Sequence, residues 1–360
     1  MEALTWAQVL AWRMRRQFLD EAVDLPAVEV ARRLAGVQAQ VGSAARLAIV
    51  LRQTASPERE VERALWEERS LVKTWAMRGT LHLLPADEAG AYLALCATVR
   101  NWEKRSWQKA FGATPADLEA MAAAAADALG DGACLTREEL TAEIVERTGS
   151  DHLSEVLGSG WGTLLKPLAW WGVLCYGPSR GATVTFAAPE HRIAGWSGRP
   201  PVEQAARTVL RAFLGAHGPA TAEAFDAWLM RGLSRVKELR AWFAALEDEL
   251  TVVEVEGTPM YVLTEHLDEI QRTGPSRAVR LLGGFDQYIL GAGTGSAHLI
   301  PSEHRGRVSR RAGWISPVVL YGGRVAGVWE VKDGEVETMT WEDVPDDRLA
   351  AETARLTALT

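Results

Sequence analysis

The order helix, helix, hairpin recurs along this sequence and limits the folds that the chain can adopt. Thr136 opens a capping box that predicts a helix over 136–149. Apolar residues at helical spacing predict a second helix over about 153–172. Strand-like runs at 173–176 and 183–186 then flank a turn-rich segment. This order is that of a winged helix, a relative of the helix-turn-helix.

The same order returns downstream. A helix over 202–217 precedes Thr221, which caps a short helix, and Ser234 caps another. Runs at 250–255 and 260–263 then form a second hairpin around Glu-Gly-Thr-Pro. A second copy makes coincidence a weaker explanation than it is for a single match.

A looser copy lies at the N-terminus. Helices are predicted near 5–19, 26–35 and 57–67, followed by strands at 71–76 and 80–84. The chain therefore reads as three modules of one kind.

The C-terminal part has a different character. Short β-rich runs at 288–290, 317–321 and 324–329 are separated by glycines, which fits a small barrel or sheet. A last helix, over about 346–356, is predicted to pack on that sheet. The predicted fold class is α+β, with three tandem winged-helix modules and a small C-terminal β-barrel-like domain. The predicted boundaries are 1–90, 91–197, 198–275 and 276–360.

Charge and cysteine content narrow the function classes. A net charge of -8 argues against a generally basic nucleic-acid coat, so any DNA contact must be local. Cys96, Cys134 and Cys175 lack metal-site spacing, which favours reduced structural thiols in a cytoplasmic protein. No apolar run has membrane-spanning length, and no signal peptide is evident, so a soluble protein without a membrane partner is expected. No metal site or hydrolase motif is evident.

Two glutamines stand out between helical segments. Gln38 and Gln40 alternate with Val37, Ala39 and Val41, so an extended segment would place both amides on the face opposite the apolar side chains. From spacing alone, the simpler interpretation is that these amides satisfy exposed backbone at a helix junction. His82, in the first hairpin, is interpreted as a packed or hydrogen-bonded residue without a chemical role.

Several segments together resemble one known family. They are Gln38-Ala39-Gln40, the run from Trp75 to Leu83, the run from Leu281 to Gly291 with Phe285-Asp286-Gln287-Tyr288, and the run from Gly322 to Trp329. In combination they resemble the HTH_42 winged-helix DNA glycosylases over nearly the whole chain. The Gln-apolar-Gln form resembles the AlkZ branch, associated with azinomycin resistance, whereas the YcaQ-like branch carries Gln-apolar-Asp.

The resemblance implies a monofunctional DNA glycosylase that excises bulky N7-alkylated purines, unhooks interstrand crosslinks and serves DNA repair or self-resistance. It also implies that Gln38 and Gln40 line the catalytic centre. Glutamine is no strong base, but it can orient water, and a cationic N7-alkylpurine leaves as a neutral base. No cofactor is expected, and without a placed amine no Schiff base is expected. Asp286 is interpreted as a turn or capping group.

The densest basic stretch runs from His298 to Arg311. We expect double-stranded DNA as the partner of a monomer, contacted by His298, His304, Arg305, Arg307, Arg310 and Arg311. An ordinary solvated loop is the alternative interpretation. Other basic side chains, Arg13 and Arg16 on the first helix among them, fit solvated helix faces. The segment from Gly291 to His298 is small and flexible where relatives commonly carry a charged lesion-probing hairpin, which leaves the lesion preference open.

A second function class remains open from the sequence. Tandem winged helices also occur in transcriptional regulators that read DNA through their second helices. A regulator needs a dimerisation element and side chains for major-groove readout, whereas a glycosylase needs one lesion-sized cleft with a catalytic constellation. No zipper or separate ligand domain is evident in this sequence. Contacts to other proteins are a third possible use of such modules.

Overall fold

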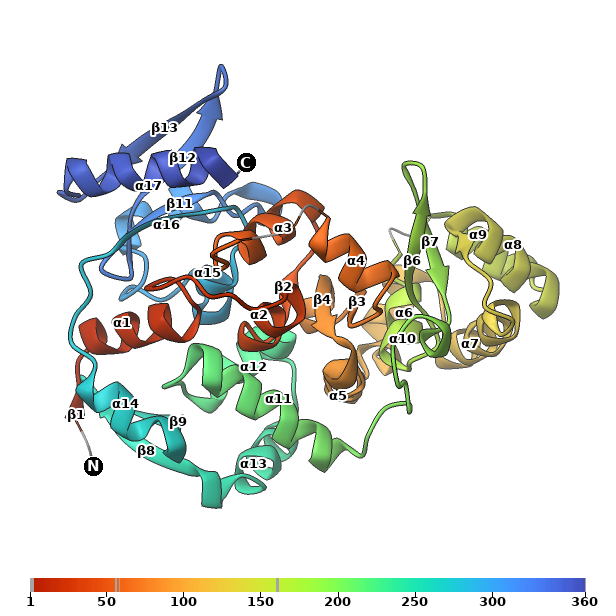
Figure 1. Cartoon of the computed structure of the whole chain (residues 1–360). Coiled ribbons are helices and arrows are strands. Elements are labelled where there is room, and N and C mark those ends of the chain that lie inside the picture. Colours follow the sequence, from red (N-terminus) through yellow and green to blue (C-terminus); the bar gives the residue numbers. More distant parts are fainter. Residues whose placement is uncertain (1–2, 56, 58, 160–161, 360) are drawn as a thin grey trace. The chain divides into compact units, whose positions relative to one another are not determined.

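The chain folds into two compact units, each built around its own core. The computed structural model describes residues 3–55, 57, 59–159 and 162–359 (Figure 1). Unit 1 combines residues 1–60, 210–232 and 236–360, and unit 2 combines residues 61–209 and 233–235. Unit 1 is therefore assembled from segments that lie far apart in the sequence.

Unit 1 contains both ends of the described chain. Its helices are α1 (Trp6–Arg16), α2 (Ala27–Arg33), α3 (Gly42–Val50), α12 (Ala222–Met230), α13 (Val236–Ala244), α14 (Leu267–Arg272), α15 (Gln287–Ala292), α16 (Arg305–Val308) and α17 (Asp346–Leu359). Its strands are β1 (Ala3–Leu4), β2 (Val37–Gln38), β8 (Leu250–Val255), β9 (Thr258–Leu263), β10 (Val279–Leu282), β11 (Val318–Tyr321), β12 (Arg324–Lys332) and β13 (Glu335–Thr340).

Unit 2 is mostly helical around two hairpins. Its helices are α5 (Ala86–Thr98), α6 (Arg105–Phe111), α7 (Pro115–Leu129), α8 (Arg137–Thr148), α9 (Asp151–Ser159) and α10 (Leu165–Trp170). Its strands are β3 (Leu71–Trp75), β4 (Leu81–Pro85), β5 (Leu135–Thr136), β6 (Cys175–Arg180) and β7 (Thr183–Ala187). Helices α4 (Glu60–Trp66) and α11 (Val202–His217) run across the unit boundaries. No helix in the described part of the chain is both long and apolar enough to cross a bilayer.

The local signals of the repeated modules are confirmed where they rest on caps and turns. Thr136 forms the predicted capping box at the start of α8, and the Thr221 hydroxyl accepts the N–H of Ala224 at the start of α12. The predicted hairpins correspond to β3–β4, β6–β7 and β8–β9. Side-chain caps satisfy backbone donors that would otherwise have no partner, so they fix a helix start from a few neighbouring residues.

One predicted helix is wrong. The run over 153–172 is divided into α9, which ends at Ser159, and α10, which begins at Leu165, and Gly162 between them has φ +71°. That left-handed conformation cannot continue an α-helix. Residues 160–161 lie outside the described residues.

The C-terminal strands form an open sheet, so the predicted barrel closure is wrong. The described strands pair in the order β10–β11–β12–β13, all antiparallel, and β10 and β13 are edges. Four strands are too few to close around a core, since a barrel filled by side chains needs about eight. Helix α17 lies along β10 and covers the sheet instead, as expected for the last helix (Figure 1).

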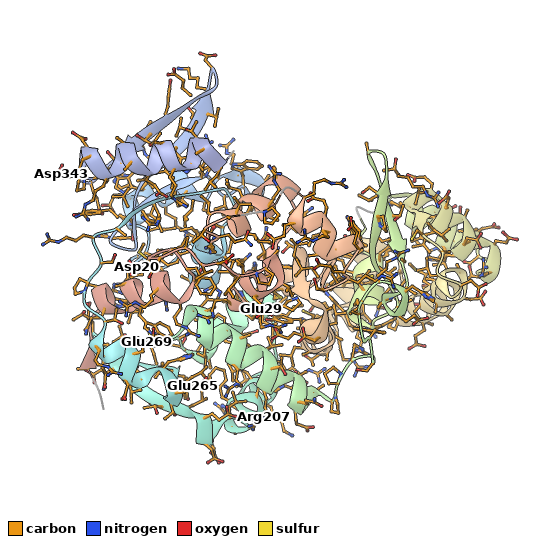
Figure 2. The ribbon with its side chains drawn as sticks, in the orientation of Figure 1. Asp20, Glu29, Arg207, Glu265, Glu269 and Asp343 are labelled. Atoms are coloured by element: carbon orange, nitrogen blue, oxygen red, sulfur yellow. The ribbon has the colours of Figure 1, made fainter. Side chains whose placement is uncertain are left out.

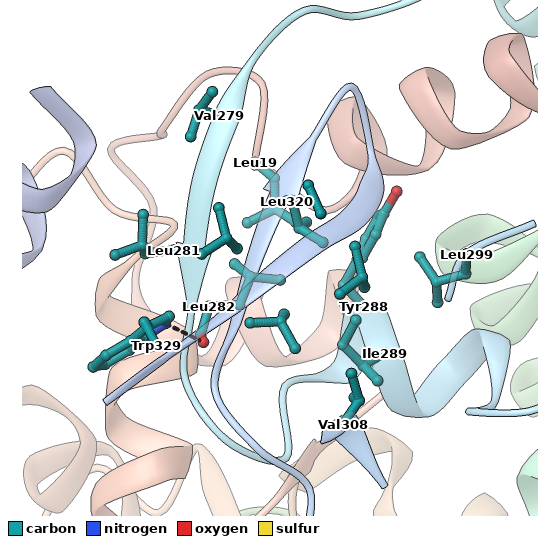
Figure 3. Packing of buried hydrophobic residues seen from close by; sticks show 14 of the residues in the cluster. Leu19, Val279, Leu281, Leu282, Tyr288, Ile289, Leu299, Val308, Leu320 and Trp329 are labelled. Atoms are coloured by element: carbon teal, nitrogen blue, oxygen red, sulfur yellow. Dashed lines mark hydrogen bonds between the residues drawn. The ribbon is translucent and has the colours of Figure 1, made fainter. Parts of the chain in front are cut away.

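The core of unit 1 joins this sheet to the N-terminal helices. Leu281, Leu320 and Trp329 of the sheet cluster with Leu19 and Tyr288, and the Trp329 indole N–H donates to the Leu282 carbonyl at 2.9 Å (Figure 3). Leu10, Met14, Leu19 and Leu51 belong to the same cluster, so apolar burial holds the N-terminal helices against the C-terminal sheet.

Residues 287–292 form helix α15, and the strand predicted at 288–290 is wrong. Asp286 caps this helix by accepting the N–H of Tyr288 at 2.9 Å, which confirms the capping interpretation of Asp286. The Tyr288 hydroxyl donates to the Gly323 carbonyl at 2.7 Å. Gly323 has φ +87°, and a Cβ there would lie 2.9 Å from that hydroxyl. A side chain at position 323 would therefore block this hydrogen bond, so the turn needs glycine there.

A buried ion pair ties three segments of unit 1 together. Arg52 and Asp286 are fully buried and meet through two N–H···O contacts of 2.8 Å each. Arg52 also donates to the carbonyls of Gln17 at 2.9 Å and Ala48 at 2.6 Å. Such a pair is tolerated in a core because every charged atom has a partner.

We predict that Asp286→Ala destabilises the protein by about 3–5 kcal/mol, because it leaves the Arg52 guanidinium buried without its counter-ion. Urea unfolding of the intact chain measures this. Glu68→Ala is the control, since the Arg63–Glu68 pair is exposed and breaking it should cost no more than about 1 kcal/mol. Equal effects of the two substitutions would contradict the structural role of the Arg52–Asp286 pair.

His82 is a packed hairpin residue, as interpreted from the sequence. It is fully buried on β4, and its Nδ1 lies 3.0 Å from the Thr80 carbonyl. Burial lowers the pKa of His82 to about 3, and the nearby Arg78 charge lowers it further while the Thr80 contact opposes the shift. The folded protein therefore keeps this imidazole neutral.

We predict an acid-dependent loss of stability that depends on His82. The unfolded chain binds a proton at His82 below about pH 6.5 and the folded chain does not until about pH 3, so stability is full above 6.5 and falls between these values. Between pH 7.5 and 5, His82→Leu should remove roughly 2 kcal/mol of that fall. Unfolding midpoints at both pH values measure it. The exposed His152, replaced by Leu, is the control; identical pH dependence in all three proteins would refute the prediction.

Candidate active site

The two glutamines lie where β2 leads into α3, and they differ in exposure. Gln38 is buried, with 7% of its surface exposed, between Val37 and Ala39 at 1% each. Gln40 is exposed in the turn before α3. The inward placement of Val37 and Ala39 is confirmed, and Val41 is half-buried. One amide is thus held in a packed strand and the other faces open space.

A surface hollow is lined in part by Val41, which follows Gln40 in the chain. It has a volume of about 380 Å³, and we call it the α3 hollow; its walls include Val41, Leu47, Phe285, Trp314, Trp329 and Leu359. Val41 follows Gln40 in the chain, so the exposed amide stands within one residue of the hollow's edge. The size falls within the roughly 300–1,000 Å³ of small-molecule sites, and the lining is mostly apolar.

Three of the predicted arginines line neighbouring hollows that share Trp314 with the α3 hollow. Arg310 and Arg311 border a more open hollow of about 790 Å³ together with Trp314. Arg307 and Arg310 line another beside Trp314, of about 740 Å³. The structure therefore brings these three arginines and the start of α3 to hollows that share one side chain.

The four arginines are exposed and largely free of carboxylate partners. An N–H of the Arg307 guanidinium donates to the Met339 sulfur at 2.8 Å. Within the described residues, Arg305, Arg310 and Arg311 make no ion pair with a carboxylate. Unpaired exposed guanidinium groups on an acidic protein provide a local binding surface for an anion such as phosphate.

The two predicted histidines are occupied in packing. His298 stacks on Trp6 with ring centroids 4.3 Å apart, and His304 stacks on Trp341 at the same distance. Each imidazole therefore has one face covered. Their proposed contact to DNA stays a prediction, made through ring nitrogens and not through the stacked face.

Arg13 is a structural residue and not part of a solvated helix face. It is buried, and it donates to the carbonyls of Gly218 at 3.1 Å and Pro219 at 2.8 Å. Burial lowers its pKa to about 10. This guanidinium satisfies backbone acceptors inside unit 1 and cannot reach a phosphate.

A further hollow of unit 1, of about 200 Å³, is lined by charges of both signs. Its Arg32 contacts Glu29 at 3.3 Å, and its Arg211 contacts Glu265 at 3.0 Å. Figure 2 labels two of its acidic side chains, Glu29 and Glu265. Because three of its four arginines, Arg16, Arg32 and Arg211, contact carboxylates, this hollow has less unpaired positive charge than the turn around Arg310.

Neither a metal site nor a thiolate nucleophile is suggested by the described residues. Among them, no group of three or more His, Cys, Asp or Glu side chains is arranged to hold a metal ion. Cys96 and Cys175 are free and buried, and burial raises the pKa of each thiol to about 12. The predicted role of these cysteines as structural thiols fits that environment.

Sequence reasoning missed Trp314. The predicted basic stretch ended at Arg311. The sequence also assigns Trp170, Trp171, Trp228 and Trp242 to the core, and the structure buries all of these but Trp171, which is half-buried. Trp314 is 47% exposed. The signal present in the sequence was a large aromatic residue three positions after an arginine pair, beside a glycine.

Comparison with known proteins gives a consistent result. A family described as "DNA glycosylase AlkZ-like" matches residues 31–359. A curated protein of Streptomyces sahachiroi, named "Interstrand DNA cross-link repair glycosylase", is 50% identical over 340 residues, which cover 94% of this chain and 91% of that protein. The solved structure of Streptomyces sahachiroi DNA glycosylase AlkZ superposes with a TM-score of 0.95 at 48% identity, covering 99% of this chain and 98% of that one.

Proposed function

This chain belongs to the AlkZ-like DNA glycosylase family, and from that premise we propose that it removes bulky N7-alkylated purines from double-stranded DNA. The enzyme class expected from the sequence, a DNA glycosylase, is confirmed by the family and by the relatives. The name of the curated relative supports interstrand crosslinks as substrates of this chain as well. A non-enzymatic regulator is correspondingly not favoured.

One observation carries the proposal. The walls of the α3 hollow include Val41, which follows Gln40 in the chain, and Trp314, which also lines the hollow bordered by Arg310 and Arg311. A glycosylase needs a lesion-sized cleft with its catalytic groups at one side and phosphate-binding cations nearby. The glutamine segment and the arginines were chosen from the sequence for two separate reasons, and in unit 1 the residue after Gln40 and the arginines line hollows that share Trp314.

The chemistry requires little acid–base help from the protein. Water forms a bond to the sugar C1′ as the N-glycosidic bond breaks, and the electron pair of that bond leaves with the base. The base departs neutral because N7-alkylation made it cationic. In our proposal the side-chain carbonyls of Gln38 and Gln40 hold the water and stabilise the positive charge that develops on the sugar. The water's proton passes to solvent.

We further propose that the recurring order of helices and hairpins represents three tandem winged-helix modules, with boundaries near residues 90, 197 and 275. The hairpins β3–β4, β6–β7 and β8–β9, each preceded by helices, support this interpretation. In a monomeric enzyme such modules would bind the duplex by shape and charge, without base-specific readout.

We predict that Gln38→Ala and Gln40→Ala each slow excision on the order of 10²-fold or more while leaving DNA affinity unchanged. Gln38→Ala should be the slower variant, and the double variant should be less than multiplicative because both amides serve one water. Gln40→Asp should retain or broaden activity toward simple N7-alkylpurines, because it supplies a base. Single-turnover formation of abasic sites in duplexes with N7-methylguanine, a bulky adduct or a crosslink measures this.

The matched control for Gln38 is Gln53→Ala. Gln53 is also a buried glutamine of unit 1, and its amide donates to the Leu25 carbonyl and to Glu60. It should lower stability without a specific loss of turnover. If both alanine variants at Gln38 and Gln40 excise at the parent rate, these glutamines are only junction residues and the catalytic assignment is wrong.

We predict that replacing Arg305, Arg307, Arg310 and Arg311 together by alanine weakens binding to damaged and undamaged duplexes alike, because phosphate contacts carry no lesion information. The slope of log K against log salt should become shallower by about one for each phosphate that the variant no longer neutralises. Titrations of fluorescent duplexes at several salt concentrations measure it. The quadruple lysine variant keeps the charge and should keep the slope; weaker binding confined to damaged DNA would overturn the phosphate assignment.

A further inference from the structure

Trp314 is an exposed aromatic residue in a cationic setting. Nearly half of its surface, 47%, is open, whereas the other tryptophans in the described part of the chain are buried or half-buried. Three surface hollows of unit 1 have Trp314 in their walls, including the α3 hollow. An indole in that position offers a flat apolar face to whatever binds there.

The turn that carries Trp314 is held in one shape. The Arg310 N–H donates to the Trp314 carbonyl at 2.8 Å, and Ser309 pairs with Ile315 in an isolated bridge. Ala312 takes φ 56° inside the turn, a left-handed conformation that side chains rarely adopt. The Phe285 ring meets the indole edge to face, with centroids 5.1 Å apart. The indole is therefore pre-positioned and not a loose surface side chain.

The charges around the turn fit nucleic acid. Arg310 and Arg311 precede the indole closely in the chain and, among the described residues, have no carboxylate partner. Aromatic faces combined with arginines are the usual platform for an unpaired base, because each base offers a π-face and the cations hold the neighbouring phosphates. The α3 hollow has both this indole and Val41, the neighbour of Gln40 in the chain, in its walls.

We propose that a nucleobase of the bound DNA, unstacked where the duplex opens at the lesion, stacks on Trp314. This inference rests on the proposed glycosylase function and extends it with a specific contact. Extruding a base leaves its partner and neighbours without a stacking surface, and an aromatic side chain restores one. Fully paired DNA has no such unstacked base, so the contact should be selective for opened duplex.

The test uses a duplex with an abasic-site analogue opposite 2-aminopurine, whose fluorescence is quenched on stacking with indole. The parent protein should quench the probe, Trp314→Ala should leave it bright, and Trp314→Phe should quench in part. Affinity for this duplex should fall about tenfold for Trp314→Ala, as expected when one base–aromatic stack is removed. Affinity for the fully paired duplex should change less than about twofold.

Phe111→Ala is the matched control, because Phe111 is another exposed aromatic residue, at 37%. It should leave quenching and both affinities unchanged. An equal fall in affinity for paired and abasic duplexes with Trp314→Ala would overturn the stacking proposal, and so would an effect seen only with a duplex whose adduct is itself aromatic. Excision of N7-methylguanine by the parent protein distinguishes a failure of the stacking proposal from a failure of the proposed function. Activity together with an unaffected Trp314→Ala variant refutes stacking alone, whereas no excision and no DNA binding by the parent refutes the proposed function too.

Discussion

The buried pair of Arg52 and Asp286 fixes the geometry on which unit 1 depends. Arg52 holds the carbonyls of Gln17 and Ala48 as well as the carboxylate, and Asp286 in turn caps α15. A buried charge needs all of its hydrogen-bond and ionic partners in place. The Arg52–Asp286 pair therefore allows little displacement of the segments that meet there. Those segments are the end of α1, the end of α3 and the start of α15. The α3 hollow lies between α3 and the residues just before α15, so its walls are set by the same pair.

Arginine has two distinct uses in this unit. Arg13 and Arg52 are buried, and both donate hydrogen bonds to backbone carbonyls. Arg52 also donates to the Asp286 carboxylate. Arg310 and Arg311 are exposed, without a carboxylate partner in the described part of the chain. The net charge of -8 therefore says little about what one turn can bind. Local potential depends on which cations remain unneutralised, and paired arginines contribute almost nothing to it.

The sequence predicted what neighbouring residues decide. Capping by Thr136 and Thr221 and the three hairpins depend on contacts a few positions apart, and they were predictable. Helix α15 was not, because its β-prone residues are outweighed by a cap whose partner Arg52 lies 234 positions away. Barrel closure failed for a similar reason, since sheet edges are a tertiary property. The candidate site divides in the same way. Gln38 and Gln40 could be chosen from alternation and resemblance, whereas the position of the exposed Trp314 ring also depends on Phe285, which lies far from it in the sequence.

The segments that carry the family resemblance have different roles: some make structural contacts, and one carries the glutamines proposed to be catalytic. Asp286 and Tyr288 of the Phe-Asp-Gln-Tyr run, and Gly323 of the Gly-Gly turn, make buried contacts with one another's elements and with α1 and Arg52. These residues form part of a shared scaffold and take no part in the proposed excision reaction. In the proposed mechanism, Gln40 is a position where the reaction could change without disturbing that scaffold, because its side chain is exposed. A relative that kept the scaffold and exchanged Gln40 for aspartate would change base strength at the site while the walls of the α3 hollow stayed where Arg52 and Asp286 hold them.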